Sequence, residues 1–315
     1  MKITTFNLEN LYNRYQFLDK PWDERSYEKY IQAVGLASIA SRKGDLVSYD
    51  LTAIQRNNTA NAILDADPDI LAVQEIENLY TLRIFNDTYL DNFFGRMISF
   101  LGNDSRGINV GLAIRKGFEC DVLNIRTHSD DGVIERKSVE DFGYIAKGEI
   151  FSRDCLEVDI MVKDKVLTLL VNHFKAQDRN VSSVKKRRRQ AEEVLKIALK
   201  AADGGKYPIV LGDLNMDPGN PQSPNDNSLD PLLNSHLLYD PFPNGTWTHY
   251  YVPEKKVSRL DYILPHRDLN VVDKEIIRKG LTTKCIQYKG ERYSTIGQQH
   301  TEASDHCPVS ITIDI

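Results

Sequence analysis

The sequence is poor in cysteine, in long apolar runs and in excess positive charge, and each shortage excludes a class of protein. Its four cysteines are far apart and form no CxxC pair, so neither a zinc site nor a disulfide framework is indicated. No stretch approaches the roughly 18 consecutive apolar residues of a membrane-spanning helix, and no signal-peptide core follows Met1. We therefore expect a cytoplasmic protein with reduced thiols and no membrane contact.

The formal net charge of −5 excludes a globally basic nucleic-acid binder. A local basic groove remains compatible with it, because acidic residues gathered at a metal site are compensated by the metal. The sequence also lacks repeats, low-complexity tracts and an interdomain linker. It therefore predicts one catalytic domain over 1–315, with surface insertions at 14–50 and 286–303.

The octet 208–215 combines a buried strand with polar side chains at its end. An Ile-Val-Leu core is followed by Gly212, Asp213 and Asn215. Residues two apart on an extended chain point to the same face, so Asp213 and Asn215 project together while Leu214 turns into the core. Such a pair suits a metal, a water or a phosphate oxygen. The alternative is an ordinary turn, which Asp and Asn often close.

Two other predicted strands also end in acidic or amide groups. The strand over 70–75 ends in Glu75. A carboxylate at the tip of a buried strand needs a cation beside it, which predicts a metal ligand; the alternative is a salt bridge at the rim. The strand over 2–7 ends in Asn7, and Glu9 is spaced to share its face.

A hairpin predicted over 156–171 carries Asn172, His173 and Lys175 at the end of its second strand. A lone histidine in such a place is most often structural. The flanking Asn172 and Lys175 favour a functional one.

Residues 181–202 predict an amphipathic helix whose first turns carry the run Lys-Lys-Arg-Arg-Arg. Cations at a helix N-terminus oppose the macrodipole, so this run requires an anionic neighbour, either a phosphate backbone or acidic side chains. A solvated face is the ordinary use of most such charges. Arg187 and Arg188 are singled out for a role. Arg188 is expected on the apolar stripe, formed by Val184, Ala191, Leu195, Ala198 and Ala202.

Polar groups at strand ends thus recur along the whole chain. Oxygen ligands in this abundance suit Mg²⁺ or Mn²⁺ better than zinc, and two histidines beside carboxylates supply proton transfer near neutral pH. Together they predict metal-dependent phosphoester hydrolysis. The groups are Asn7, Glu9, Glu75, Asn172, His173, Asp213, Asn215, Asp261, Asp305 and His306.

These groups lie in short motifs that follow one another in a fixed order along the chain. In this order of motifs the chain resembles the endonuclease/exonuclease/phosphatase superfamily over 3–313. Looser similarities around 7–12, around 104–108 and in the Arg-rich helix are to its bacterial nuclease-like members. The motifs are Thr5-Phe6-Asn7, Gln74-Glu75, Asn172-His173, Gly212-Asp213-Leu214-Asn215, Arg259-Leu260-Asp261-Tyr262 and Ser304-Asp305-His306.

The resemblance implies an α/β fold, a four-layer α/β/β/α sandwich of two mixed sheets flanked by helices. The site would lie where loops meet at one edge of both sheets. Glu75 would bind the metal directly, with Asn7, Glu9 and Asp305 around it. Glu9 departs from the pattern, because many relatives have Asn or Asp there, and its longer side chain would shift or add a metal contact.

The resemblance also implies roles for the other motifs. Asp213 and Asn215 would orient the attacking water and a phosphate oxygen. His306, hydrogen-bonded to Asp261, would act as general base or as a phosphate-stabilising imidazolium. Which of Asp213 and His306 takes the proton stays open at this point. His173 matches the DNase, sphingomyelinase and phosphatase branches, whereas the abasic endonucleases have a tyrosine there.

The leading hypothesis is a Mg²⁺- or Mn²⁺-dependent nuclease, with DNA favoured over RNA and no obligate protein partner. Asn172, Lys175, Arg115 and Arg188 would contact the phosphate or backbone. The alternative keeps the site but acts on a small phosphomonoester, an inositol phosphate or a phospholipid headgroup. A third possibility, an inactive binding module, is disfavoured because every catalytic position is filled.

Overall fold

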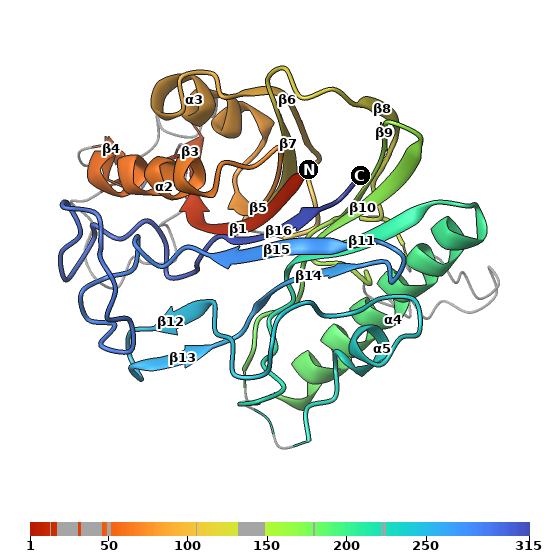
Figure 1. Cartoon of the computed structure of the whole chain (residues 1–315). Helices are drawn as coiled ribbons and strands as arrows, with labels where there is room; N and C mark the ends of the chain where they lie inside the picture. Colours follow the sequence, from red (N-terminus) through yellow and green to blue (C-terminus); the bar gives the residue numbers. More distant parts are fainter. Residues whose placement is uncertain are drawn as a thin grey trace, which may run out of the picture.

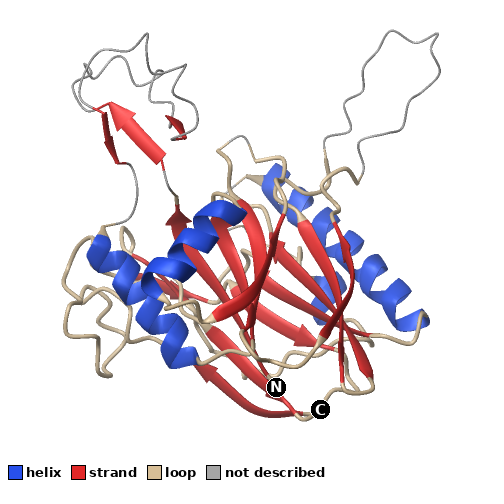
Figure 2. Cartoon of the chain, turned by 90° about the horizontal axis from the view of Figure 1, so that it is seen from above, coloured by secondary structure: helices blue, strands red, loops and turns tan. Residues whose placement is uncertain are grey.

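Two β-sheets pack face to face in this protein, and helices cover both outer faces (Figures 1 and 2). The structure is a computed structural model. It confirms the four-layer α/β/β/α sandwich. The residues it describes are 1–12, 14–17, 31–32, 46–48, 52–104, 106–131, 149–178, 180–221, 223 and 225–315.

The first sheet has the strand order β15-β16-β1-β5-β7-β6. It is mixed, because β1 and β5 are parallel whereas the other pairs are antiparallel. Helices α2 and α3 cover its outer face, where Ile63 and Phe85 pack with Phe6 and Val73. The elements are β1 (Lys2–Leu11), α2 (Ala53–Ala66), β5 (Ile70–Ile76), α3 (Leu79–Tyr89), β6 (Phe94–Ser99), β7 (Asn109–Arg115), β15 (Val271–Ile276) and β16 (Val309–Ile313).

The second sheet has the order β14-β11-β10-β9-β8 and is also mixed, with β10 parallel to β11. Helices α4 and α5 cover it, and Val194 and Ala198 pack with Leu170 and Val210. Its elements are β8 (Asp121–Arg126), β9 (Cys155–Val162), β10 (Lys165–His173), α4 (Val181–Asp203), β11 (Tyr207–Asp213), α5 (Asp230–Leu233) and β14 (Asp261–Pro265). Outside both sheets lie the hairpin of β12 (His249–Tyr251) and β13 (Lys256–Ser258), and β2 (Arg14–Phe17), β3 (Ile31–Gln32) and β4 (Leu46–Ser48).

The main core lies between the sheets, and strand alternation aims the site residues into the same interlayer space. Ile3 of β1, Leu169 of β10 and Leu211 of β11 all face this core. Side chains two residues apart share a face. The strand-end residues Asn7 and Asp213 therefore emerge between the sheets at one end of the sandwich.

Glycine is the only residue type that fits at position 212, where β11 approaches β10. Its φ of +131° is unfavourable for a residue with a side chain, and an added Cβ would lie 2.0 Å from the carbonyl oxygen of Asn172. The strand passes through this glycine instead of stopping at it, so Asp213 is still held in register opposite His173 and Asp261.

Most predicted elements lie within a few residues of their expected bounds. Helix α2 begins after Thr52, whose side chain forms a capping box with Gln55, and ends at Asp67 in a left-handed conformation before Pro68. Helix α5 is a single turn with Pro231 near its N-terminus. The sequence interpretation missed α3, β6, β13 and β15 altogether.

Helix α4 corrects one prediction. Its buried face is displaced from the expected stripe, so Arg187 is fully buried whereas Arg188 is partly exposed. Arg187 reaches the carbonyls of Lys175 and Ala176 and the carboxylate of Asp226. It therefore serves as an internal clamp between two loops.

The predicted insertion 14–50 lies mostly outside the described residues. The insertion 286–303 belongs to the long connection between β15 and β16 and is packed against α2. Thr295 donates to Asn58, and Asn58 and Thr59 donate to the carbonyls of Thr301 and Ala303. No helix of the described chain is long and apolar enough to cross a membrane.

His128, after β8, provides a test of pH-dependent stability. Burial alone would lower its pKa, but hydrogen bonds to Glu157 and Asp131, at 2.9 and 2.7 Å, raise it above the ordinary value. This stabilisation is complete below the unfolded-state pKa and is lost as pH rises through the raised folded-state pKa. We expect His128→Gln to lower the unfolding free energy by about 1 kcal/mol near pH 6 and by much less near pH 9.

Urea unfolding at both pH values measures this difference. His236→Gln is the control, because His236 is exposed. Equal losses at the two pH values would contradict the role of the imidazolium.

Candidate active site

Three strands and the segment before β16 bring a carboxylate–imidazole cluster together at one end of the sandwich. Asp213 at the end of β11 lies opposite Asp261 at the start of β14. His306 Nδ1 is 2.9 Å from Asp261 Oδ2, and its Nε2 is 3.9 Å from Asp213 Oδ2. Asn7 Nδ2 donates to Asp213 Oδ2 at 3.1 Å, which joins the two sheets. His306 thus lies between the two buried carboxylates.

Thr248, which the sequence interpretation missed, fixes Asp261 from behind. Its hydroxyl donates to Asp261 Oδ2 at 2.7 Å and accepts from the amides of Leu260 and Asp261. All of these atoms are buried. The orientation of His306 is therefore set by a chain of hydrogen bonds.

The pKa values of the ionisable groups in this cluster are strongly shifted from their ordinary values. Burial, Asp261 and Glu75 raise the pKa of Asp213 to about 7 against the opposing effects of His306 and Asn7. Burial would lower the pKa of His306, but Asp261, Asp213 and Asp305 raise it well above its ordinary value. These directions favour Asp213 as the proton acceptor and His306 as an imidazolium at neutral pH.

A second cluster, of the carboxylates Glu9, Glu75 and Asp305, lies beside the first. The Asp305 amide donates to Glu9 Oε2 at 2.9 Å, and the Asn10 amide donates to Glu75 Oε2 at 3.1 Å. Burial and then Asp305 raise the pKa values of both Glu9 and Glu75. These carboxylates are partly buried, and like charges held so close together are costly unless a cation lies among them.

Backbone irregularity brings these carboxylates inward. In a regular β5, Glu75 would share the outward face of Leu71 and Val73. Instead the register shifts between Gln74 and Ile76, and Glu75 has a φ of +60°. The bulge turns its side chain toward the site. Glu9 has a positive φ as well, of +48°.

The residues fit a divalent cation bound by oxygen. Three carboxylates and the Asn7 amide form a donor set of the kind that Mg²⁺ or Mn²⁺ uses. The mutual repulsion of Glu9, Glu75 and Asp305 is the observation that supports the fit. Two other groups of described residues, Asp213 with Asp261 and His306, and His249 with Asp305 and His306, have donor atoms that all lie within 4.8 Å of one another, whereas the set of Glu9, Glu75 and Asp305 is more open.

Two arginines complete the site, and the sequence interpretation assigned neither a role. Arg153 Nε and Arg106 Nη2 each lie 3.0 Å from Asp104 Oδ2. Arg153 is buried, and its charge lowers the pKa of Glu75. Arg106 is 62% exposed, so its guanidinium is accessible to a ligand. The motif around Asp104 and Gly107 could have identified Arg106 from the sequence. Nothing in the sequence around Arg153 indicated its place in the site.

Members of both clusters, Glu75, Asp213, Asp305 and His306, line a cleft of about 470 Å³. The β12–β13 hairpin supplies one wall, with His249 and Tyr251, and the loops after β10 and β11 supply another, with Gln177 and Pro221. His249 was also missed, because it lies within an aromatic run that reads as core. Its signal was its place at the start of the hairpin whose second strand leads to Asp261.

His173 and Asn215 lie at the cleft as expected. His173 Nε2 is 3.4 Å from Asp213 Oδ2 and 3.8 Å from Glu75 Oε1. Burial and Arg153 lower its pKa well below the ordinary value, which favours neutral imidazole. Asn215, with a φ of +56°, donates its side-chain amide to the Phe174 carbonyl and its backbone amide to Asp213 Oδ1.

The residues expected from the sequence to contact phosphate do not all lie at the cleft. Asn172 is fully buried, shares the helix-facing side of β10 with Leu170, and donates to the Leu170 carbonyl. Lys175 adjoins cleft residues, and its backbone binds the side chains of Gln190 and Arg187. Arg188 binds Glu192 and the Asn227 carbonyl, away from the cleft lining. The structure therefore contradicts direct cleft contacts for Asn172 and Arg188.

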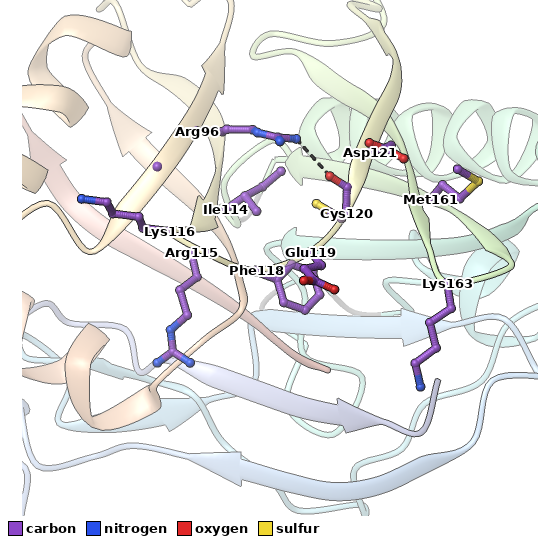
Figure 3. A pocket seen from close by; sticks show the side chains of 12 residues that line it. Arg96, Ile114, Arg115, Lys116, Phe118, Glu119, Cys120, Asp121, Met161 and Lys163 are labelled. Carbon is purple, nitrogen blue, oxygen red and sulfur yellow. Dashed lines mark hydrogen bonds between the residues drawn. The ribbon is translucent and has the colours of Figure 1, made fainter.

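Arg115 is wrongly placed by the sequence hypothesis. It pairs with Asp67 and with Asp69, which precedes β5, whereas Glu75 is at the other end of that strand, about 20 Å away. Arg115 lines a separate hollow of about 580 Å³ together with Arg96, Lys116 and Lys163 (Figure 3).

Comparison with known proteins agrees with the fold and identifies the family. The model of the Endonuclease/Exonuclease/phosphatase family matches residues 43–306. The chain belongs to this family, whose members are metal-dependent phosphoester hydrolases. No curated protein sequence matches the chain.

Several solved structures share the architecture at low sequence identity. An endonuclease/exonuclease/phosphatase from Bacteroides vulgatus has a TM-score of 0.60 at 14% identity, covering 100% of this chain and 98% of the other. A humanized D. rerio TDP2 has a TM-score of 0.58 at 13% identity, covering 100% and 99%. A mannosyl-6-phosphatase from Bacteroides thetaiotaomicron has a TM-score of 0.57 at 16% identity, covering 100% of both chains. At such identities the likeness establishes the fold alone.

Proposed function

We propose that this protein is a Mg²⁺- or Mn²⁺-dependent nuclease that hydrolyses phosphodiester bonds of DNA, or of RNA, by in-line attack of water. The observation that carries the proposal is the buried Asp213–His306–Asp261 cluster directly beside the carboxylates of Glu75 and Asp305. A proton acceptor, a cationic hydrogen-bond donor and a cation site thereby converge on one cleft, as phosphoester hydrolysis requires.

Each residue has a proposed role. Asp213 takes a proton from water as the water oxygen bonds to phosphorus. The bond to the leaving oxygen breaks on the far side, and that oxygen takes a proton from solvent. His306 donates to a non-bridging phosphate oxygen and is held by Asp261. A divalent cation held by Glu75, with Glu9, Asp305 and Asn7, would neutralise negative charge on the phosphate.

The remaining polar residues would position the phosphate. Neutral His173 and Asn215 flank Asp213 at the cleft, and exposed Arg106 reaches it from the opposite side. Such contacts hold the reacting atoms in line without taking part in proton transfer.

The nucleic-acid part of the proposal is supported by cations around the cleft. Arg106 and Lys256 line the cleft, and Lys175 adjoins the wall formed by the loop after β10, beside the head of α4, where Lys185 is exposed. A polyanion spanning the cleft would meet all of them. All four cysteines are free thiols, which supports the further proposal of a reducing, cytoplasmic setting.

A phosphatase is the second candidate. The cleft volume of about 470 Å³ is of the size that holds a small molecule, and a mannosyl-6-phosphatase is among the structures that share the fold. In that case the same residues would act on a sugar or inositol phosphate.

Hydrolysis assays separate the two candidates. Supercoiled plasmid, single-stranded DNA and RNA would be incubated with Mg²⁺ or Mn²⁺, beside sugar phosphates assayed for phosphate release. We expect nicking that EDTA abolishes and that weakens steeply with salt, because phosphate contacts release counterions. Intact nucleic acid together with phosphate release from the small substrates would favour the phosphatase.

A further inference from the structure

We infer that His249 is a positioning residue that holds the Asp305 carboxylate at the cation site. His249 Nε2 lies 3.5 Å from Asp305 Oδ2, whereas the other oxygen, Oδ1, is 3.8 Å from His306 Nε2. The Asp305 carboxylate is therefore flanked by an imidazole on each side.

The imidazole of His249 is itself fixed. Its Nδ1 lies 3.0 Å from the hydroxyl of Ser258, its register partner across the hairpin. When Ser258 donates to Nδ1, the proton of the neutral ring is on Nε2 and faces Asp305. The ring also packs against His306, with 4.6 Å between centroids, and against Tyr251.

The backbone ties the same two segments together. Residues 249 and 306 form an antiparallel bridge. The Tyr250 amide donates to the Asp305 carbonyl at 2.9 Å, and the Cys307 amide donates to the Thr248 carbonyl at 2.7 Å. Consecutive residues of one short segment thus support both acidic partners of the site: Thr248 holds Asp261, and His249 holds Asp305.

The charges around Asp305 act in opposite directions, because Glu9 and Glu75 repel its carboxylate whereas His249 and His306 attract it. Two further carboxylates, Glu9 and Glu75, share its region, and its side chain is 34% exposed. A partly exposed carboxylate beside like charges is free to turn toward solvent unless a neighbouring donor holds it. A hydrogen bond from Nε2–H keeps it aimed inward and lowers the ordering cost of binding a cation.

Titration of the metal-free protein with Mn²⁺, followed by electron paramagnetic resonance of the free ion, tests this role without substrate. We expect His249→Ala to weaken Mn²⁺ binding about 10- to 100-fold. His249→Gln places an amide donor near the position of Nε2 and should retain most of the affinity. His249→Asn carries the same amide one methylene shorter and should behave like alanine. Lys255→Ala, at the exposed hairpin tip, is the control.

Steady-state kinetics supply the second readout. A positioning role predicts that saturating Mn²⁺ restores the kcat of His249→Ala, because the loss lies in cation binding. Wild-type Mn²⁺ affinity in His249→Ala, equal affinities of the Gln and Asn variants, or a kcat that excess Mn²⁺ does not restore would each overturn the assignment. The Gln–Asn comparison remains decisive if the alanine variant fails to fold.

This role of His249 depends on the cation site proposed above, and Glu75→Gln tests that site separately. If Glu75→Gln binds Mn²⁺ as tightly as wild type, the proposed site is wrong whatever His249 does. If Glu75→Gln loses binding while His249→Ala does not, only the role of His249 fails.

Discussion

Asp213→Asn is expected to reduce kcat/KM by about 10³- to 10⁴-fold at neutral pH. The amide keeps the size of the side chain and can still accept from Asn7, but it cannot take a proton from water. Phosphodiester hydrolysis at saturating Mn²⁺ measures the loss, and the KM should change far less than kcat.

The pH profile of the wild type supplies a check on the same residue. Because the pKa of Asp213 is raised to about 7, kcat/KM should rise with pH through that value as the carboxylate becomes available. Asp164→Asn, in the exposed turn between β9 and β10, is the matched control and should leave the profile unchanged. Near wild-type turnover in Asp213→Asn would show that another group is the base.

His306→Ala is expected to cause a loss of about 10²- to 10⁴-fold, since it removes the cationic donor to the phosphate. Asp261→Asn should cause a smaller loss with a diagnostic change in pH dependence. Asp261 helps to raise the pKa of His306, so its neutralisation lowers that pKa. The alkaline decline of kcat/KM should then begin at lower pH than in the wild type.

Comparing kcat/KM across pH for Asp261→Asn and wild type measures this shift. An unchanged alkaline limb would mean that His306 does not need its proton during turnover. Thr248→Val, which removes the hydroxyl that holds Asp261, should resemble a mild form of Asp261→Asn.

The motifs allowed both the fold and the centre of the site to be predicted. Gly212, Asp213 and Asn215 are consecutive or nearly so, and strand alternation alone places Asp213 on the inner face. Glu75 was identified for its position at a strand end, yet alternation alone would have turned it outward. The bulge that reverses it has no signal in the residues 70–75 themselves.

Other parts of the site depend on tertiary contacts that local pattern does not contain. Arg153 reaches the cleft only because Asp104, far away in sequence, receives its guanidinium. Because the buried face of α4 is displaced from the expected stripe, Arg187 is buried and Arg188, which was expected on the apolar stripe, is partly exposed. Arg115 was misassigned because sequence reveals that a residue ends a strand, but not at which end of the sheet it lies.

The hydrogen bond from Asn7 to Asp213 has a consequence for refolding. It spans 206 positions and joins the first sheet to the second, and the bond from Ser304 to the Asn7 carbonyl spans 297. Contacts between residues so distant in sequence form slowly, because long loops must close first. Recovered hydrolysis after dilution from denaturant would therefore report the docking of the two sheets, and an intermediate with only one sheet formed would be inert.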